Sequence, residues 1–213
     1  MRNEPHLQCS SVGEIEMNPN TKRKLYEIRW HGRGGQGAIT AAKIVAQAAF
    51  REGYRGITAA PAFGAERRGA PVSASTRISH EPVLVMSQVE NPDVVVVLDD
   101  TLLKHDGVLD GLAKGGWLIV NSRQEPGQLN CHGEFNVATA DATTICRDLG
   151  LIISGLTIVN TAILGAFAKA TGLLKIESIE SVVRERFPGA DVDINLAAIE
   201  KTYEITKTKE ARN

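Results

Sequence analysis

The spacing of apolar and polar residues predicts both strands and helices along this chain. Short apolar runs bounded by glycine, proline or asparagine predict strands, and longer segments with apolar residues three or four positions apart predict helices. The clearest strand is the valine run at residues 94–98, which follows Asn91-Pro92-Asp93 and ends at Asp99-Asp100. Because the run has no polar alternation, we expect it to be buried on both faces at the centre of a parallel sheet.

Strands alternate with helices early in the sequence, and helices dominate late. Strands are predicted at residues 25–30, 56–61, 70–79, 94–98, 117–120 and 135–138. Helices are predicted at residues 38–50, 142–149, 155–171, 176–187 and 192–207. This order predicts an α/β fold, a single Rossmann-like domain over residues 24–207 with a parallel or mixed sheet, a half-exposed strand insertion at 70–79 and a C-terminal helical extension. Residues 1–23 and 208–213 are predicted to be tails.

Charge and hydropathy narrow the class of protein. The 213 residues include 24 Lys and Arg and 25 Asp and Glu, a net charge of −1, which gives no field to attract nucleic acid or an anionic membrane. The apolar runs are far shorter than the roughly 20 residues of a membrane span, and the N-terminus is polar where a secretory signal would be apolar. We therefore expect a cytoplasmic protein with no nucleic-acid or membrane partner.

The cysteines limit the redox chemistry of this chain. Cys9, Cys131 and Cys146 are odd in number and scattered, so they form neither a disulfide framework nor a CxxC metal or iron–sulfur set. Any redox cluster is expected on another chain. A chain of this length is also short for a self-sufficient multi-cofactor enzyme, which leaves room for a subunit.

A glycine-rich segment fits G-x-G-x-x-G at Gly32, Gly34 and Gly37, between a predicted strand and a predicted helix. Gly32 would permit the tight turn, Gly34 and Gly35 would let backbone N–H groups approach an anion, and the helix would point its positive end at that anion. A phosphate or carboxylate would suit this site. Alternatively, the glycines serve only close packing of strand against helix.

A nicotinamide or flavin site is not expected at this turn. Such sites usually add an acidic residue about 20 residues further on, which binds the ribose hydroxyls. The corresponding residues 57–60 read Ile-Thr-Ala-Ala.

A second candidate site is the loop at residues 61–71, in which Arg67 and Arg68 follow Glu66. Paired guanidinium groups suit a phosphate or carboxylate clamp. A salt bridge between domains or subunits through Glu66 is an equally good alternative. Asp99-Asp100 is either a carboxylate site or a helix N-cap. The other candidates lack metal-ligand spacing and are expected on the surface or in turns: His31, His80, His105 and His132.

In combination, four segments resemble the gamma subunit of the 2-oxoacid:ferredoxin oxidoreductases, the pyruvate synthase family. They are GRGGQG followed by AAKI, the loop PAFGAERRGAPVSASTRIS, Asn91-Pro92-Asp93 before the valine run, and TIVNTAILG at 157–165. The resemblance covers residues 26–186 and is weaker over the leading tail and the last helix.

The resemblance implies a share in a multisubunit enzyme that converts a 2-oxoacid and CoA to acyl-CoA and CO₂ and passes electrons to ferredoxin or a similar carrier. Thiamine diphosphate, magnesium and 4Fe-4S clusters would belong to partner subunits of the alpha, beta and delta types. This chain would supply assembly contacts and part of the site for CoA, the cosubstrate, with no catalytic residue and no metal of its own. The residues assigned to CoA are Gly34, Gly35, Gln36, Gly37, Arg67 and Arg68.

Two other functions remain open at this stage. One is a noncatalytic scaffold subunit of the same type of complex. The other is a free-standing nucleotide-binding oxidoreductase.

Overall fold

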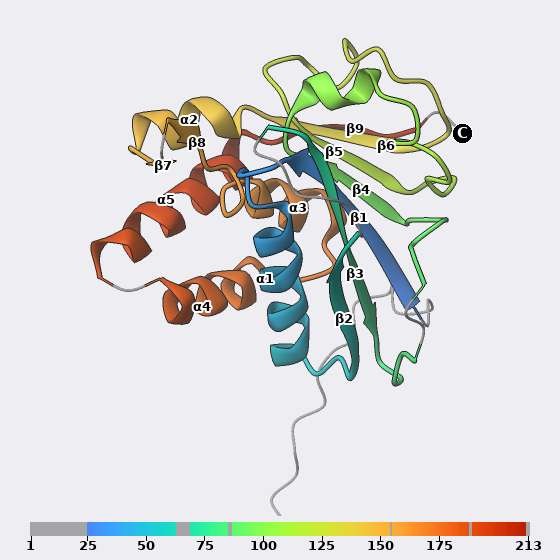
Figure 1. Ribbon diagram of the computed structural model, residues 1–213, viewed down its shortest axis with the longest axis horizontal. Helices are drawn as coiled ribbons and strands as arrows, with labels where there is room; N and C mark the ends of the chain where they lie inside the picture. Colours follow the sequence, from blue (N-terminus) through green and yellow to red (C-terminus); the bar gives the residue numbers. More distant parts are fainter. Residues whose placement is uncertain (1–24, 63–68, 85–86, 154, 188, 212–213) are drawn as a thin grey trace, which may run out of the picture.

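The computed structural model describes residues 25–62, 69–84, 87–153, 155–187 and 189–211. Its main feature is a seven-stranded sheet in the order β2-β3-β1-β4-β5-β6-β9 (Figure 1). The strands are β1 (Leu25–Arg33), β2 (Gly56–Pro61), β3 (Pro71–Ser79), β4 (Val94–Val97), β5 (Trp117–Asn121), β6 (Asn136–Ala140) and β9 (Lys207–Lys209). β1, β4, β5 and β6 are parallel, whereas β2, β3 and β9 join antiparallel at the two edges. The mixed α/β sheet is as expected.

Most of the helices lie on one side of the sheet (Figure 1). The helices are α1 (Ala38–Arg51), α2 (Ala142–Asp148), α3 (Ile163–Thr171), α4 (Ile176–Arg186) and α5 (Ala190–Ile205). A short 3-10 helix, η1 (Asp100–Lys104), covers the other side beyond β4, and a small hairpin of β7 (Ile152–Ile153) and β8 (Leu156–Thr157) precedes α3. None of the helices in the described ranges is long and apolar enough to cross a membrane.

The valine strand is buried on both faces, as its sequence predicts. Val94 and Val96 belong to the core beneath α1 and α3, and Val95 and Val97 belong to a second core that includes Leu102 of η1. All four valines are at most 4% exposed. β4 therefore joins two apolar layers and lies fourth of the seven strands.

The strand insertion is confirmed, but it is less exposed than expected. β3 lies between β1 and β2, and the side chains from Thr76 to Ser79 are buried. Thr76 explains part of this burial, because its hydroxyl accepts a hydrogen bond from the Trp30 indole at 3.0 Å and donates to the Ala42 carbonyl at 3.1 Å. The insertion is thus tied to β1 and α1.

The first strand is longer than its sequence indicates. Antiparallel pairing with β3 continues through Gly32↔Val72 and Arg33↔Pro71, so Gly32 lies in β1 and not in the turn. A Cβ at Gly32 would meet the Cβ of Ala38 at 3.3 Å. Gly32 therefore serves the close approach of α1 to β1, and our assignment of the tight turn to this residue is wrong.

Two C-terminal elements also differ from the expected ones. The helix predicted from residue 155 begins only at Ile163, because β7 and β8 form the hairpin and Gly155 adopts φ 79°, outside the helical region. The last helix ends at Ile205, and Lys207–Lys209 pairs with β6. This strand satisfies backbone groups that β6 would otherwise expose at an open edge, so residues 208 and 209 are not a tail. The N-terminal residues 1–23 lie outside the described ranges.

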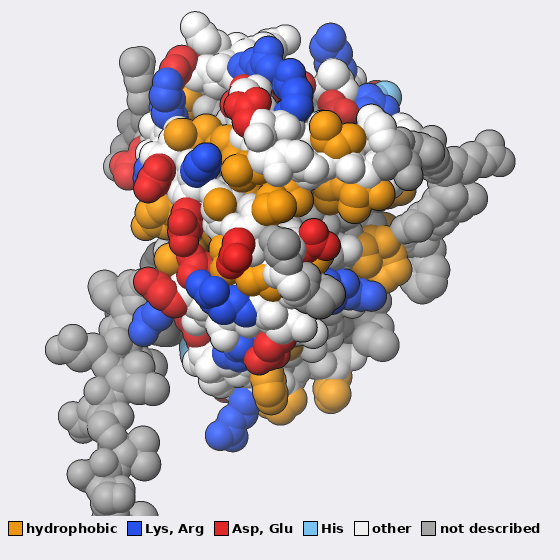
Figure 2. Space-filling model, turned by 90° about the vertical axis from the view of Figure 1, so that its left-hand side faces the viewer, with side chains coloured by type: hydrophobic (Ala, Val, Ile, Leu, Met, Phe, Trp, Pro, Cys, Tyr) orange, Lys and Arg blue, Asp and Glu red, His pale blue; other side chains and the backbone are white. Residues whose placement is uncertain are grey.

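One lateral face of the molecule carries charges of both signs. Figure 2 shows acidic and basic side chains interspersed there, with hydrophobic side chains gathered between them. This distribution matches the near balance of 24 basic and 25 acidic residues in the sequence.

The strand β1 has one apolar and one polar face. Ile28 and Trp30 are fully buried against the helices, whereas Arg29 and His31 point to the opposite side. The Arg29 guanidinium donates to the Asp110 carbonyl at 2.6 Å and to His31 Nε2 at 3.1 Å. Burial, followed by the neighbouring Arg29 charge, lowers the pKa of His31 to about 4. His31 is thus a half-buried strand residue, not the surface or turn residue we expected.

Gly165 sets the distance between α3 and α5. A Cβ there would collide with the carbonyl oxygen of Ile199 and lie 2.7 Å from the Tyr203 nitrogen, both backbone atoms of α5. We predict that Gly165→Ala lowers the free energy of unfolding by about 2 kcal/mol or more, because the helices must separate. If helix propensity alone mattered, Gly165→Ala would raise the free energy of unfolding by up to about 1 kcal/mol. Urea denaturation of both proteins therefore distinguishes the two effects by the sign of the change.

His31 should make stability depend on pH. Its folded-state pKa lies below its unfolded value, so the unfolded chain binds the proton first and stability falls as the pH falls from about 6.5 toward 4. We predict that wild type loses about 2 kcal/mol relative to His31→Gln between about pH 7.5 and pH 5. Urea denaturation of both proteins measures this. If the stabilities of wild type and His31→Gln change with pH in parallel, the prediction is wrong and the pKa of His31 does not differ between the folded and unfolded chains.

Candidate anion-binding site

The turn between β1 and α1 is held by its own backbone and by a neighbouring segment. Gly35 and Gly37 adopt φ 98° and 83°, in the left-handed region that favours glycine. Gly34 donates its N–H to the Ala70 carbonyl at 2.8 Å and accepts from the Gly69 N–H at 3.0 Å. The Gln36 side-chain oxygen accepts from the Arg33 N–H at 2.7 Å. The predicted glycine turn therefore exists, but it begins after Gly32.

The glycines also allow close packing, the second role that the sequence left open. A Cβ at Gly37 would lie 2.5 Å from Nδ2 of Asn160, and a Cβ at Gly35 would lie 2.9 Å from the Leu156 side chain. The segment from Leu156 to Asn160 therefore covers part of the turn. Sequence reasoning did not connect these two segments, which are about 120 residues apart in the chain.

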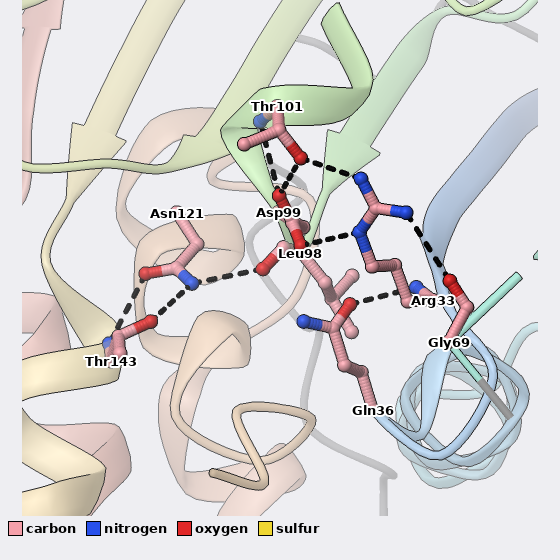
Figure 3. Close-up of polar contacts among 8 residues, drawn as sticks. All are labelled: Arg33, Gln36, Gly69, Leu98, Asp99, Thr101, Asn121 and Thr143. Atoms are coloured by element: carbon pink, nitrogen blue, oxygen red, sulfur yellow. Dashed lines mark hydrogen bonds and ion pairs between the residues drawn. The ribbon is translucent and has the colours of Figure 1, made fainter. Parts of the chain in front are cut away.

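Arg33 joins the turn to the carboxyl end of β4 (Figure 3). Its guanidinium is 2.9 Å from the Asp99 carboxylate and donates to the Thr101 hydroxyl at 2.8 Å and to the Gly69 carbonyl at 3.2 Å. Asp99 also caps η1 by accepting from the Thr101 N–H, which confirms the N-cap alternative. Burial works to raise the pKa of Asp99, but hydrogen bonds from Thr101 and Arg33 outweigh it and lower the pKa.

Arg67 and Arg68, with Glu66, lie outside the described residues. The structure does describe the residues on either side, up to Ala62 and from Gly69 onward. Ala62 donates to the Ser73 carbonyl at 2.9 Å, and Gly69 is bonded to Gly34. Gly69 and Ala70, at the C-terminal end of the arginine loop, therefore meet the glycine turn.

A polar crevice of about 480 Å³ opens beside this turn. It is lined by Gln36, by residues 155–157 and by polar side chains at the carboxyl ends of β4, β5 and β6. Ligands of open α/β sheets commonly bind at this edge. Our sequence reasoning missed most of these residues, although polar residues directly after successive strands are the signal for them.

The polar groups of the crevice are largely paired with one another. Asn121 donates to the Leu98 carbonyl at 2.9 Å and to Thr143 at 2.8 Å (Figure 3). Ser122 donates to Asp100 at 2.7 Å. The Arg123 guanidinium lies 3.0 Å from the Asp141 carboxylate. Burial works to raise the pKa of Asp141, but hydrogen bonds from Thr144 and the charge of Arg123 outweigh it, so the pKa is lowered. The crevice is therefore better suited to binding a polar molecule than to transferring protons.

Metal or thiolate chemistry finds little support in the part of the chain that the structure describes. It contains no group of three or more His, Cys, Asp or Glu side chains that could hold a metal ion. Burial raises the pKa of the Cys146 thiol to about 12, so Cys146 stays protonated near neutral pH.

Comparison with known proteins identifies the family. The pattern of the pyruvate ferredoxin/flavodoxin oxidoreductase family matches residues 27–205. The common subunit gamma of the pyruvate/ketoisovalerate oxidoreductases of Pyrococcus furiosus is 50% identical over 189 residues, which cover 87% of this chain and 100% of that protein. The pyruvate synthase subunit PorC of Methanosarcina barkeri is 47% identical over 187 residues, covering 88% and 100% of the two chains.

Solved structures agree in fold. The pyruvate oxidoreductase subunit PORC of Thermotoga maritima superposes with a TM-score of 0.74 at 37% identity and covers 88% of this chain and 100% of that one. The 2-oxoglutarate:ferredoxin oxidoreductase of Magnetococcus marinus, at 18% identity and a TM-score of 0.67, shares the fold over 86% of this chain and 31% of its own. This chain belongs to the pyruvate ferredoxin/flavodoxin oxidoreductase family, as a gamma subunit of the multisubunit enzyme.

Proposed function

We propose that this gamma subunit forms part of the CoA site of a 2-oxoacid:ferredoxin oxidoreductase. The complex would convert a 2-oxoacid and CoA to acyl-CoA and CO₂ and pass two electrons to ferredoxin or a similar carrier. The relatives are named for pyruvate and ketoisovalerate, which favours pyruvate or a branched-chain 2-oxoacid as substrate. Thiamine diphosphate, magnesium and 4Fe-4S clusters would be held by alpha-, beta- and delta-type partner subunits and supply decarboxylation and electron transfer.

The observation that carries the CoA proposal is the pair of hydrogen bonds between Gly34 and the segment Gly69–Ala70. They bring Gly69 and Ala70, at the end of the arginine loop, to the turn that leads into α1, a helix whose N-terminus no described side chain caps. Backbone N–H groups at a helix N-terminus and guanidinium groups both bind phosphate. CoA carries a diphosphate and a 3′-phosphate, so one ligand could use both elements.

In this proposal Gly34, Gly35, Gln36 and Gly37 approach a CoA phosphate or the pantetheine arm, and Arg67 and Arg68 bind the anionic groups. The paired charges of the neighbouring crevice leave its acidic side chains largely neutralised. The relatives are subunits of oxidoreductases, which favours this function over a free-standing nucleotide-binding oxidoreductase. They equally disfavour a scaffold without a part in the reaction.

Changing Arg67 or Arg68 should weaken the binding of CoA and leave the preceding reaction of the 2-oxoacid unchanged. We predict that Arg67→Ala or Arg68→Ala in the intact complex raises the KM for CoA about ten- to a hundredfold, because a charge-assisted contact is lost. Electron release from the 2-oxoacid without CoA, followed as a single turnover, should stay near the wild-type rate. Arg→Lys should rescue only partly, since an ammonium lacks the bidentate fork.

Arg55→Ala is the matched control, because Arg55 is an exposed arginine at the opposite end of β2. It should leave the KM for CoA unchanged. If the Arg67 and Arg68 variants keep a normal CoA dependence but the complex separates into subunits on gel filtration, the loop is an assembly element and the CoA role is wrong.

A further inference from the structure

Another pocket, of about 250 Å³, lies over β1, β2 and β3 on the side of the sheet that most of the helices leave uncovered (Figure 1). Residues directly opposite each other on paired strands share a face of the sheet. Here Ser75 lies opposite Arg29 of β1 on one side and opposite Ala60 of β2 on the other. Because Ser75 and Ala60 are short, they leave a hollow beside the long Arg29 side chain. The glycine turn at residues 34–37 does not line this pocket, so the CoA proposal leaves it unused.

The lining of this pocket is basic. Among its described residues, Arg29 and Arg77 carry positive charges and none is an aspartate or glutamate. The Arg77 guanidinium is 2.8 Å from the Glu27 carboxylate, so its charge is compensated. Arg29 makes no ion pair with a described residue, and its guanidinium is met by backbone carbonyls, which carry only partial charges. Burial lowers the pKa of Arg29, and the charge of Asp110 only partly offsets this.

Arg29 and His31 each keep a hydrogen-bond donor that no described residue uses. His31 is neutral near pH 7, and its Nε2 accepts from Arg29 Nε at 3.1 Å, so its proton lies on Nδ1. A guanidinium has five N–H donors. Those of Arg29 serve His31, the Val89 carbonyl through one Nη1 hydrogen, and carbonyls of residues 107–110 through Nη2, which leaves one Nη1 hydrogen. Both residues line the pocket and neither is fully buried, so a ligand can reach them.

We propose that this pocket binds a small organic carboxylate through the Arg29 guanidinium and His31 Nδ1–H. The carboxylate would accept charge-assisted hydrogen bonds and compensate the charge of Arg29. Ala60, Pro61 and Val89 also line the pocket and would contact a short carbon chain, which favours an organic acid over inorganic phosphate. The volume is below that of pockets for drug-sized ligands, about 300 Å³ and above, so the occupant is small. The site goes beyond the proposed function and does not depend on it.

Ser75→Leu tests the pocket without removing either donor. The leucine side chain would fill the hollow between Arg29 and Ala60, while Arg29 keeps its hydrogen bonds to the carbonyls. We expect the carboxylate to bind at least about tenfold more weakly, because ligand and leucine compete for the same space. The matched control is Ser178→Leu, the same change at a half-exposed serine of α4, on the helix side of the sheet (Figure 1). It should bind as wild type does.

The experiment is an NMR titration of the ¹⁵N-labelled full chain near neutral pH with isobutyrate, isobutyramide and inorganic phosphate at constant ionic strength. Isobutyramide keeps the shape of isobutyrate without its charge, and phosphate keeps a charge without the carbon chain. We expect isobutyrate to shift the Arg29 Nε–H signal and the backbone amide signals of Ser73 and Ser75. The other two compounds should bind at least about tenfold more weakly, since each lacks one of the two interactions.

Three results would overturn the proposal: no shifts with isobutyrate, equal affinity for isobutyramide or phosphate, or equal isobutyrate affinity in wild type and Ser75→Leu. If Ser75→Leu does not fold, Ala60→Leu decides in the same way, because it fills the hollow from the exposed edge strand β2.

An acidic side chain of a partner subunit offers the same chemistry as a free acid, and the same variants distinguish the two sources. If isobutyrate causes no shifts and Ser75→Leu makes the complex separate on gel filtration, the pocket receives a carboxylate of the partner, and the proposal of a free acid is wrong. Isobutyrate shifts in wild type, together with an intact Ser75→Leu complex, support the free acid.

Discussion

The close approach of the β1–α1 turn to its neighbours is the constraint on which the rest of this site depends. Gly34 exchanges two backbone hydrogen bonds with Gly69 and Ala70, while Gly35 and Gly37 lie against Leu156 and Asn160. Positive φ angles and the lack of a Cβ make these contacts possible. As a result, one turn fixes the end of the arginine loop on one side and the segment before α3 on the other.

The sheet brings the remaining polar groups to the same place. β4 is buried on both faces and pairs in parallel with β1 and β5, so the carboxyl ends of these strands share one edge. Arg33, Asp99 and Thr101 connect the turn to that edge through ion-pair and hydrogen-bond contacts. Most of the charged groups described at this edge are therefore already paired with one another.

This distribution of groups agrees with the proposed function, in which the subunit would bind and position a ligand and partner subunits would carry the redox chemistry. The described residues offer hydrogen-bond donors at a helix N-terminus, and the one fully buried cysteine among them has a pKa raised to about 12. His31 behaves similarly, since burial and Arg29 keep it neutral at ordinary pH and suit it to a structural role in β1.

The sequence alone determined the α/β class, the double burial of the valine strand, the strand insertion and the presence of a glycine turn, because local apolar spacing and glycine placement encode these features. It assigned the wrong role to Gly32 and missed β9, since both depend on pairing with a distant strand. Only the tertiary structure showed that Asn160 lies against Gly37 and that the neighbouring Thr161 is hydrogen-bonded to Asn195. Contacts between residues so far apart in the chain leave no local pattern, because they arise only when α1, α3 and α5 pack on the same side of the sheet.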